Sequence, residues 1–266
     1  MGRLLSGLAI FAVAYAHSVP TRAVDGPFPP FAVVELFTSE ACSSCPPAER
    51  IFSELVARAA ARQQPVYGLA FHVDYFNGLG WTDPFSSADS TARQNAYQRF
   101  TRTGEVYTPQ LIVNGTHELV GAERSRAGTE VDAALARPAT AGIEIELDAV
   151  ATALLRQGES AGPAGVTVSY SVVGAPRRAV LNLALVESGL TSHVSSGENS
   201  GRTLTHDNVV RAFVTVPLRS RPTGTATLVI PAGVVAGHAS IIGFVQDPSS
   251  MAILGAAASA LSTGPH

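Results

Sequence analysis

Cys42 and Cys45 are the only cysteines in the chain, and two residues separate them. A disulfide between them would close a very short loop, which stabilises a fold least in the chain-entropy model. Thiol pairs at this spacing are typical of redox chemistry instead. A structural zinc site needs about two more soft ligands, and the chain has no second cysteine pair and no closely spaced histidine pair. The pair is therefore the first candidate for a catalytic redox centre.

Other residues could assist a thiol. His72 and Asp74 end a predicted strand, where they could act as a proton shuttle or as partners of the Cys42 thiolate. They could equally cap the loop that follows. His206 lies in the polar segment 199–211 and could reach Cys42 from far along the chain, although a segment held by its own hydrogen bonds is the alternative.

The segment 74–90 is rich in loop-forming residues and contains the aromatic side chains of Tyr75, Phe76 and Trp81. Trp81 could help to form an apolar wall that binds a peptide beside the cysteines. The alternative is that these rings form a small core of their own. The helix predicted next, over 90–101, is expected to turn Arg93, Gln94 and Arg99 towards solvent.

The elements that must position the cysteines are predicted from hydrophobic runs. Two buried strands flank an amphipathic helix, which indicates a parallel pair with a right-handed crossover. The turn Asn114-Gly115 is a strong hairpin signal. The predicted segments are strands at 31–37, 66–73, 111–113 and 118–121, and helices at 48–62, 90–101 and 123–136.

The second half of the chain changes character. Apolar and polar residues alternate in six segments separated by Gly, Pro and Ser, which favours an antiparallel β-sandwich. These predicted strands cover 143–147, 166–173, 179–187, 209–218, 225–230 and 240–246. The Ala-rich segment 255–266 is predicted to be a short helix or a loose tail.

Composition excludes several classes of function. The net charge is −3, so no basic surface for nucleic acid is expected. All 18 basic residues are arginines, which rules out a lysine Schiff base and a phosphate-loop lysine.

The first 23 residues resemble a secretory signal peptide, with cleavage expected near residue 16 or 23. Its apolar core is shorter than the roughly 20 residues of a membrane span. No later segment is long and apolar enough to anchor the mature chain, so we expect a protein exported to the bacterial periplasm or secreted.

The order of the elements, with Cys42-x-x-Cys45 before a helix and Thr108-Pro109 before a hairpin, resembles the thioredoxin superfamily. The chain is also similar to a bacterial family of exported thioredoxin-like proteins, catalogued as a domain of unknown function. The matching runs are LFTSEACSSCPPA (36–48), FHVDY (71–75), YTPQ (107–110) and GRTLTHDNVVR (201–211). The expected fold is an α/β thioredoxin-like domain over 31–138, followed by an all-β antiparallel sandwich domain over 140–254.

This resemblance implies roles for the site residues. Cys42 would be the exposed attacking thiolate at the start of the helix, and Cys45 would resolve the mixed disulfide. Pro109 would follow a cis peptide bond and lie against the cysteines, with Tyr107 and Thr108 helping to bind an extended substrate. Because Pro46 and Pro47 resist helical geometry before them, the helix is expected either to begin near Cys45 or to have a distorted first turn.

The leading interpretation is an exported thiol–disulfide oxidoreductase that acts on a protein or peptide and needs no organic cofactor. One alternative is a copper carrier that binds Cu(I) through Cys42, Cys45 and His72. Another is a partner-binding module with a vestigial cysteine pair. The sequence leaves open the direction of the redox chemistry, the electron partner and the oligomeric state.

Overall fold

The computed structural model describes residues 27–100, 104–148, 164–219 and 221–261, so the predicted signal peptide lies outside the described residues. The predicted order of elements in the first half of the chain is confirmed. Among the described residues, no helix is both long and apolar enough to span a membrane. The elements of this half are β1 (Ala32–Thr38), α1 (Cys45–Ala61), β2 (Val66–His72), α2 (Ala88–Gln98), β3 (Gln110–Val113), β4 (His117–Val120) and α3 (Arg124–Leu135).

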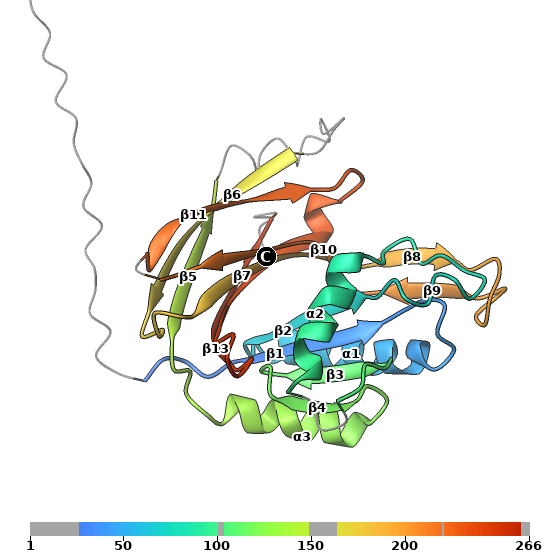
Figure 1. Ribbon diagram of the computed structural model, residues 1–266, viewed down its shortest axis with the longest axis horizontal. Coiled ribbons are helices and arrows are strands. Elements are labelled where there is room, and N and C mark those ends of the chain that lie inside the picture. Colours follow the sequence, from blue (N-terminus) through green and yellow to red (C-terminus); the bar gives the residue numbers. More distant parts are fainter. Residues whose placement is uncertain (1–26, 101–103, 149–163, 220, 262–266) are drawn as a thin grey trace, which may run out of the picture.

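Strand β1 lies at the centre of this half, and all of its residues are therefore buried. It pairs in parallel with β2 and antiparallel with β3. Helices α1 and α3 cover one face of the sheet, where Phe52 and Val131 pack beside Leu36. Helix α2 covers the other face, where Tyr97 packs with Phe37 (Figure 1). The chain segment between β1 and α1, which carries the cysteines, leaves this sheet at the carboxyl end of β1.

The second half is almost entirely strands, and pairing within it is antiparallel. Its elements are β5 (Gly142–Leu147), β6 (Ala164–Val173), β7 (Val180–Glu187), β8 (Leu190–His193), β9 (Thr203–His206), β10 (Val209–Pro217), β11 (Thr223–Ile230), the 3₁₀ helix η1 (Ala236–His238), β12 (Ala239–Gln246) and β13 (Ile253–Ala260).

One mixed sheet joins the two halves. Its strand order is β13-β12-β7-β10-β2-β1-β3-β4, so β10 extends the sheet beside β2. The junction is short: Val209 pairs with Ala70, whose N–H donates to the carbonyl of Asn208 at 2.8 Å. Sharing the sheet protects the edge of β2, which would otherwise be unpaired. Of the strands in the second half, β7, β10, β12 and β13 therefore continue the sheet of the first half, whereas a separate sandwich was expected.

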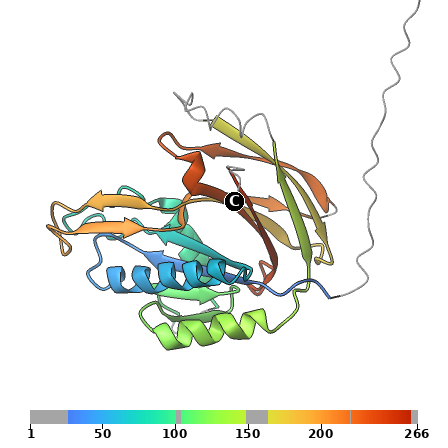
Figure 2. The ribbon, with the colours of Figure 1, turned by 180° about the vertical axis from the view of Figure 1, so that it is seen from behind.

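A second sheet, with strand order β11-β6-β5, packs on β7 and β12 around a core that includes Val168, Leu183 and Ile241 (Figure 1). A third, two-stranded sheet is the β8–β9 hairpin, which extends from the main body alongside α1 (Figure 2).

The prediction of a helix or loose tail from residue 255 is wrong. Residues Ile253–Ala260 form β13, which pairs with β12 from Gln246 back to Ser240. Small alanine side chains favour a helix in isolation, but the free edge of β12 offers a complete set of backbone partners. Tertiary pairing therefore overrides the local preference.

The prediction that α2 turns Arg93 and Gln94 to solvent is also wrong. The Arg93 side chain is only 8% exposed and donates to Glu35 Oε1 at 2.5 Å. Its guanidinium lies over four aromatic rings, those of Phe71, Tyr97, Phe213 and Phe244. The face of α2 that carries this arginine packs between the two halves of the chain, whereas Arg99 is exposed as expected.

Candidate functional site

The cysteine pair lies where the chain passes from β1 into α1. Cys45 is the first residue of the helix, and its N–H donates to the carbonyl of Cys42 at 3.2 Å. The two sulfurs are present as thiols. Cys42 is 4% exposed and Cys45 is 0% exposed, so the attacking sulfur that we expected at the surface is almost covered. Ser43 and Ser44, between them, are exposed.

The two prolines decide where the helix begins. Pro46 and Pro47 follow Cys45 in the first turn, where no N–H is needed for the helical hydrogen bonds. The helix therefore begins at Cys45, the first of the two expected arrangements. Cys42 lies three residues before the helix, so hydrogen bonds near its sulfur become more important for its thiolate than the helix dipole.

The two thiols differ strongly in acidity. Hydrogen bonds from Cys45, Ser44 and Thr108 lower the pKa of Cys42 to about 6, although burial opposes this. Burial, followed by the hydrogen bond to Cys42, raises the pKa of Cys45 far above its usual range. The sulfur of Cys42 lies 3.2 Å from Ser44 Oγ. The arrangement can hold one thiolate and one thiol side by side.

The segment Tyr107-Thr108-Pro109 approaches this pair through Thr108. The Thr108–Pro109 peptide bond is cis, and the Cys42 thiol donates to the carbonyl of Thr108 at 3.9 Å. The hydroxyl of Tyr107 donates to Glu118 Oε1 at 2.6 Å, and its carbonyl accepts from Gln94 at 2.8 Å. Tyr107 is thereby fixed by β4 and α2.

Trp81 lies beside the residues that precede Cys42. Its indole N–H donates to Glu40 Oε2 at 2.7 Å, and the side chain is half-buried. Trp81 thus attaches the segment 74–90 to the residues just before Cys42. Its contacts are those of an anchor for that segment.

His72 and Asp74 have different hydrogen-bond partners. His72 Nδ1 lies 2.7 Å from Asp83 Oδ2, in a pair with both side chains fully buried. Asp74 instead accepts a hydrogen bond at 2.6 Å from Thr91, a residue of α2, and so ties the start of the following loop to that helix. The loop-capping interpretation therefore holds for Asp74, and the partner of His72 is a residue that the sequence did not single out.

His206 reaches the first half of the chain, where its hydrogen-bond partners are two carboxylates. Its Nδ1 lies 2.7 Å from Glu49 Oε2, and its Nε2 lies 2.9 Å from Glu40 Oε1. Although burial opposes a positive charge, these two carboxylates raise the pKa of His206 to about 10. The ring also lies edge-on to that of His72, with centroids 4.9 Å apart.

Sequence reasoning missed three buried carboxylates that contact His72 and His206, namely Glu40, Glu49 and Asp83. One signal was available for Glu49, which follows Cys45 by four residues and precedes Phe52 by three, on the buried face of the helix. Thr38 Oγ1 donates to Glu49 Oε1 at 2.5 Å. No comparable spacing marks Glu40 or Asp83, because both lie in loops.

The segment 199–211 reaches the cysteine segment, as one of the two predictions had it, through Asn199 in the loop between β8 and β9. The side-chain amide of Asn199 donates to the carbonyls of Glu40 and Cys42, at 2.8 and 3.0 Å. Glu198 Oε2 accepts from the N–H of Ser43 at 2.9 Å. The loop between β8 and β9, in the far half of the chain, therefore holds the backbone around Cys42.

The donor atoms of Glu49, His72 and His206 lie within 4.8 Å of one another. In the part of the chain that the structure describes, the cysteine sulfurs do not join His72 in such a group. The neighbours of His72 are thus an imidazole and carboxylates.

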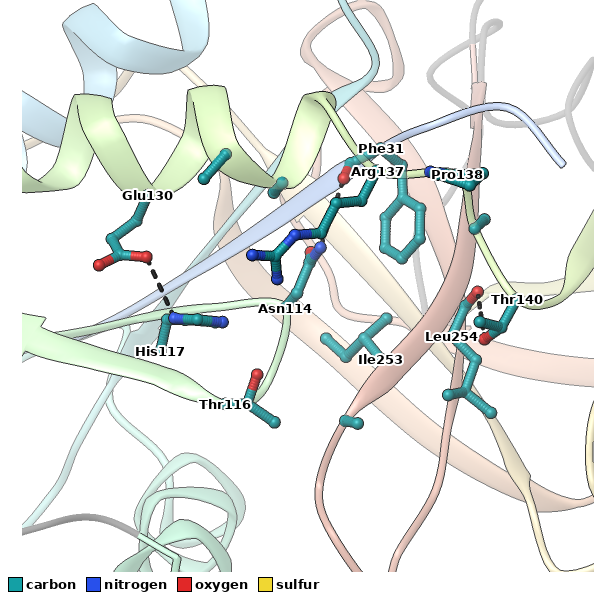
Figure 3. A pocket seen from close by; sticks show the side chains of 14 residues that line it. Phe31, Asn114, Thr116, His117, Glu130, Arg137, Pro138, Thr140, Ile253 and Leu254 are labelled. Carbon is teal, nitrogen blue, oxygen red and sulfur yellow. Dashed lines mark hydrogen bonds and ion pairs between the residues drawn. The ribbon is translucent and has the colours of Figure 1, made fainter. Parts of the chain in front are cut away.

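A cavity of about 210 Å³ lies elsewhere, between the end of α3 and the start of β13. Figure 3 shows Phe31, Asn114 and Ile253 around it, with His117 and Glu130 paired at 3.1 Å. None of the residues lining it belongs to the cysteine segment or to the buried carboxylates. This cavity contributes nothing to the candidate redox site.

The fold and the site together define a mixed α/β protein with one large sheet and a cysteine pair at the start of a helix. The chain belongs to a family described as "Protein of unknown function (DUF1223)", which matches residues 33–246.

Two solved structures are similar over most of the chain. A crystal structure of an Agrobacterium tumefaciens protein covers 88% of this chain and 96% of its own, with 26% sequence identity and a TM-score of 0.61. HBP35 of Porphyromonas gingivalis covers 90% of this chain and 77% of its own, with 14% identity and a TM-score of 0.60. The second likeness concerns the fold alone. No curated protein matches the chain.

Proposed function

We propose that this protein is an exported thiol–disulfide oxidoreductase, with a thioredoxin-like α/β region followed by a β-sandwich region. The observation that carries the proposal is the opposite shift of two adjacent thiols: the pKa of Cys42 is lowered to about 6, and that of Cys45 is raised. A thiolate is the nucleophile in disulfide exchange. The contact between Cys42 Sγ and the carbonyl of Thr108, 3.9 Å apart, also supports it, because the thioredoxin resemblance implies that this segment lies beside the cysteines.

In the reducing direction, the Cys42 thiolate attacks one sulfur of a substrate disulfide. A Cys42–substrate disulfide forms, and the other substrate sulfur leaves as a thiolate. Cys45 then loses its proton and attacks the Cys42 sulfur, which forms the Cys42–Cys45 disulfide and releases the second substrate thiolate. The substrate gains two electrons from the cysteine pair. The two released thiolates take up two protons, one given up by Cys45 and one from solvent. In the oxidising direction the same steps run in reverse.

The substrate class is a protein or peptide that carries a thiol or a disulfide. Pro109, Thr108 and Tyr107 would shape the binding surface next to Cys42, and no organic cofactor is needed. The signal-like first 23 residues support export, to the periplasm or outside the cell. Disulfides form and persist in such oxidising compartments.

The low exposure of Cys42, 4%, favours a second candidate, a partner-binding module with a vestigial cysteine pair. In that case the loops and strand edges of the second half would bind the partner. A vestigial pair would form a bond that is hard to reduce, whereas a catalytic pair exchanges readily with other thiols.

The test is the redox equilibrium of Cys42 and Cys45 against glutathione in the purified mature protein. A reversible two-electron couple between about −270 and −120 mV supports the oxidoreductase, and one below about −300 mV contradicts it. Two matched variants sharpen the test. Cys45→Ser should trap a mixed disulfide of Cys42 with glutathione, and Cys42→Ser should trap none, because Cys45 is 0% exposed.

A further inference from the structure

Near the cysteine segment, two histidines are each paired with a buried carboxylate. His72 Nδ1 lies 2.7 Å from Asp83, and His206 Nε2 lies 2.9 Å from Glu40. Both imidazoles and both carboxylates are almost inaccessible to solvent. Glu49, from α1, completes the group on the other side of His206.

The free nitrogen of His72 is the feature that calls for a ligand. In the part of the chain that the structure describes, Nε2 of His72 is buried and has no hydrogen-bond partner. Nδ1 of His72 faces the carboxylate of Asp83 at 2.7 Å, which leaves Nε2 as the nitrogen available to a ligand. An imidazole held in this way by a carboxylate is the usual arrangement of a metal-ligating histidine.

His206 is held in the same manner. Glu40 accepts from its Nε2, and Glu40 is itself fixed by hydrogen bonds from Trp81 at 2.7 Å and Ser192 at 2.9 Å. The other nitrogen, Nδ1, faces Glu49 Oε2 at 2.7 Å. The two carboxylate–histidine pairs thus lie side by side, with ring centroids 4.9 Å apart, and the carboxylate of Glu49 contacts His206.

The charge of this cluster also favours a cation. Three buried carboxyl side chains, Glu40, Glu49 and Asp83, face two imidazoles, so acidic side chains outnumber basic ones in this cluster. Burying excess charge is costly unless an opposite charge compensates for it. A divalent ion bound among these side chains would compensate for the carboxylates.

We propose that Glu49, His72 and His206 bind a divalent first-row transition metal ion, with Zn²⁺ as the best-matched candidate. Two imidazole nitrogens and one carboxylate oxygen form a known ligand set for zinc, at about 2.0–2.2 Å from the ion. Their donor atoms already lie within 4.8 Å of one another. The ion would link α1, β2 and β9, and so fasten the β8–β9 hairpin to the sheet that carries the cysteines.

This site is separate from the proposed redox pair, since neither cysteine is a ligand. The test therefore uses the full mature chain in two forms, wild type and Cys42→Ser/Cys45→Ser, stripped with a chelator and then loaded with Zn²⁺. We expect both to retain about one Zn²⁺ per chain after desalting. Both should also melt at a higher temperature with Zn²⁺ than with Mg²⁺, because an ion that binds only the folded state stabilises it.

Two variants test the ligands, and a third is the control. His72→Gln should lose the retained Zn²⁺ and the thermal shift, and Asp83→Asn should weaken Zn²⁺ binding about 10- to 100-fold through the orientation of His72. His117→Gln, at an exposed histidine that also pairs with a glutamate, should bind as wild type does. Circular dichroism reports whether each variant is folded.

Three results would overturn the proposal: no Zn²⁺ retained by the wild type, Zn²⁺ lost from the double-serine variant, or full retention in folded His72→Gln. If His72→Gln does not fold, the Co²⁺ spectrum of the wild type decides. A band from thiolate-to-cobalt charge transfer would place the ion at the cysteines and contradict the proposal, and its absence in a Co²⁺-loaded chain supports it. The redox potential is measured separately, so either proposal can fail alone.

Discussion

The side-chain amide of Asn199 donates a hydrogen bond to the carbonyl of Cys42 at 3.0 Å, across 157 positions of sequence. Asn199 is completely buried, and the same amide group holds the carbonyl of Glu40. The shape of the cysteine segment in the first half of the chain thus depends on a loop of the second half.

Asn199→Ala should make Cys42 more reactive. The variant leaves two buried carbonyls without their partner, which costs about 1–3 kcal/mol. If that cost lowers the free energy of local opening, alkylation of the reduced protein by iodoacetamide should be roughly 5- to 150-fold faster. The control is Ser200→Ala, in the same loop, whose exposed hydroxyl bonds within the loop. Equal rates for the two variants would show that the loop does not protect the thiol.

The reactivity of Cys42 should depend on pH with a midpoint near 6, the lowered pKa of its thiol. An unperturbed cysteine would give a midpoint near 8.5. The alkylation rate should therefore rise through about pH 6 and level off above it. Ser44→Ala removes one of the hydrogen bonds that stabilise the thiolate, so its midpoint should move to higher pH. Ser43→Ala, the exposed neighbour, should leave the midpoint unchanged.

The same shift predicts how stability depends on pH. Because the pKa of Cys42 is lower in the folded state, its contribution to the stability of the reduced protein is fully present above the unfolded value and is lost as the pH falls through about 6. Urea denaturation of the reduced wild type should show a fall over this range that Cys42→Ser lacks. A fall of the same size in Cys42→Ser would assign the effect to other groups.

Arg93→Met should destabilise the protein by about 3–5 kcal/mol, because it leaves Glu35 buried without its partner. The double variant Glu35→Leu/Arg93→Met should be less destabilised than Arg93→Met alone, since no buried charge then remains. Arg99→Met, on the exposed end of the same helix, should change the free energy of unfolding by less than about 0.5 kcal/mol. Urea denaturation measures all three, and an additive double variant would contradict the coupling.

Gly255→Ala should destabilise the fold by about 1–3 kcal/mol through overpacking at the start of β13. A Cβ atom there would lie 2.1 Å from the carbonyl oxygen of Ala141, a backbone atom that cannot move alone. Gly237→Ala is the matched control, because nothing lies within 4 Å of the added atom. Equal melting temperatures for the two variants would argue against the close packing of β13.

Part of the fold could be predicted because its signals are local. The hydrophobic run of β1, the amphipathic face of α1 and the Asn114-Gly115 turn each lie within a short window of sequence. The spacing of Cys42 and Cys45 is equally local, and it indicated a candidate redox pair without any knowledge of the structure. Such patterns report which residues share a face and where the chain turns.

The rest was decided by contacts between distant residues. The alanines of β13 form a strand because β12 offers a free edge, and Arg93 is buried because aromatic rings from both halves surround it. His206 finds Glu49, a residue 157 positions away, only once β9 lies beside α1. Local sequence determines the type of each element and the presence of the thiols. Which edges pair, and which charges are buried together, depends on the energy of the assembled fold, because neither a strand edge nor a buried charge has a partner within its own segment.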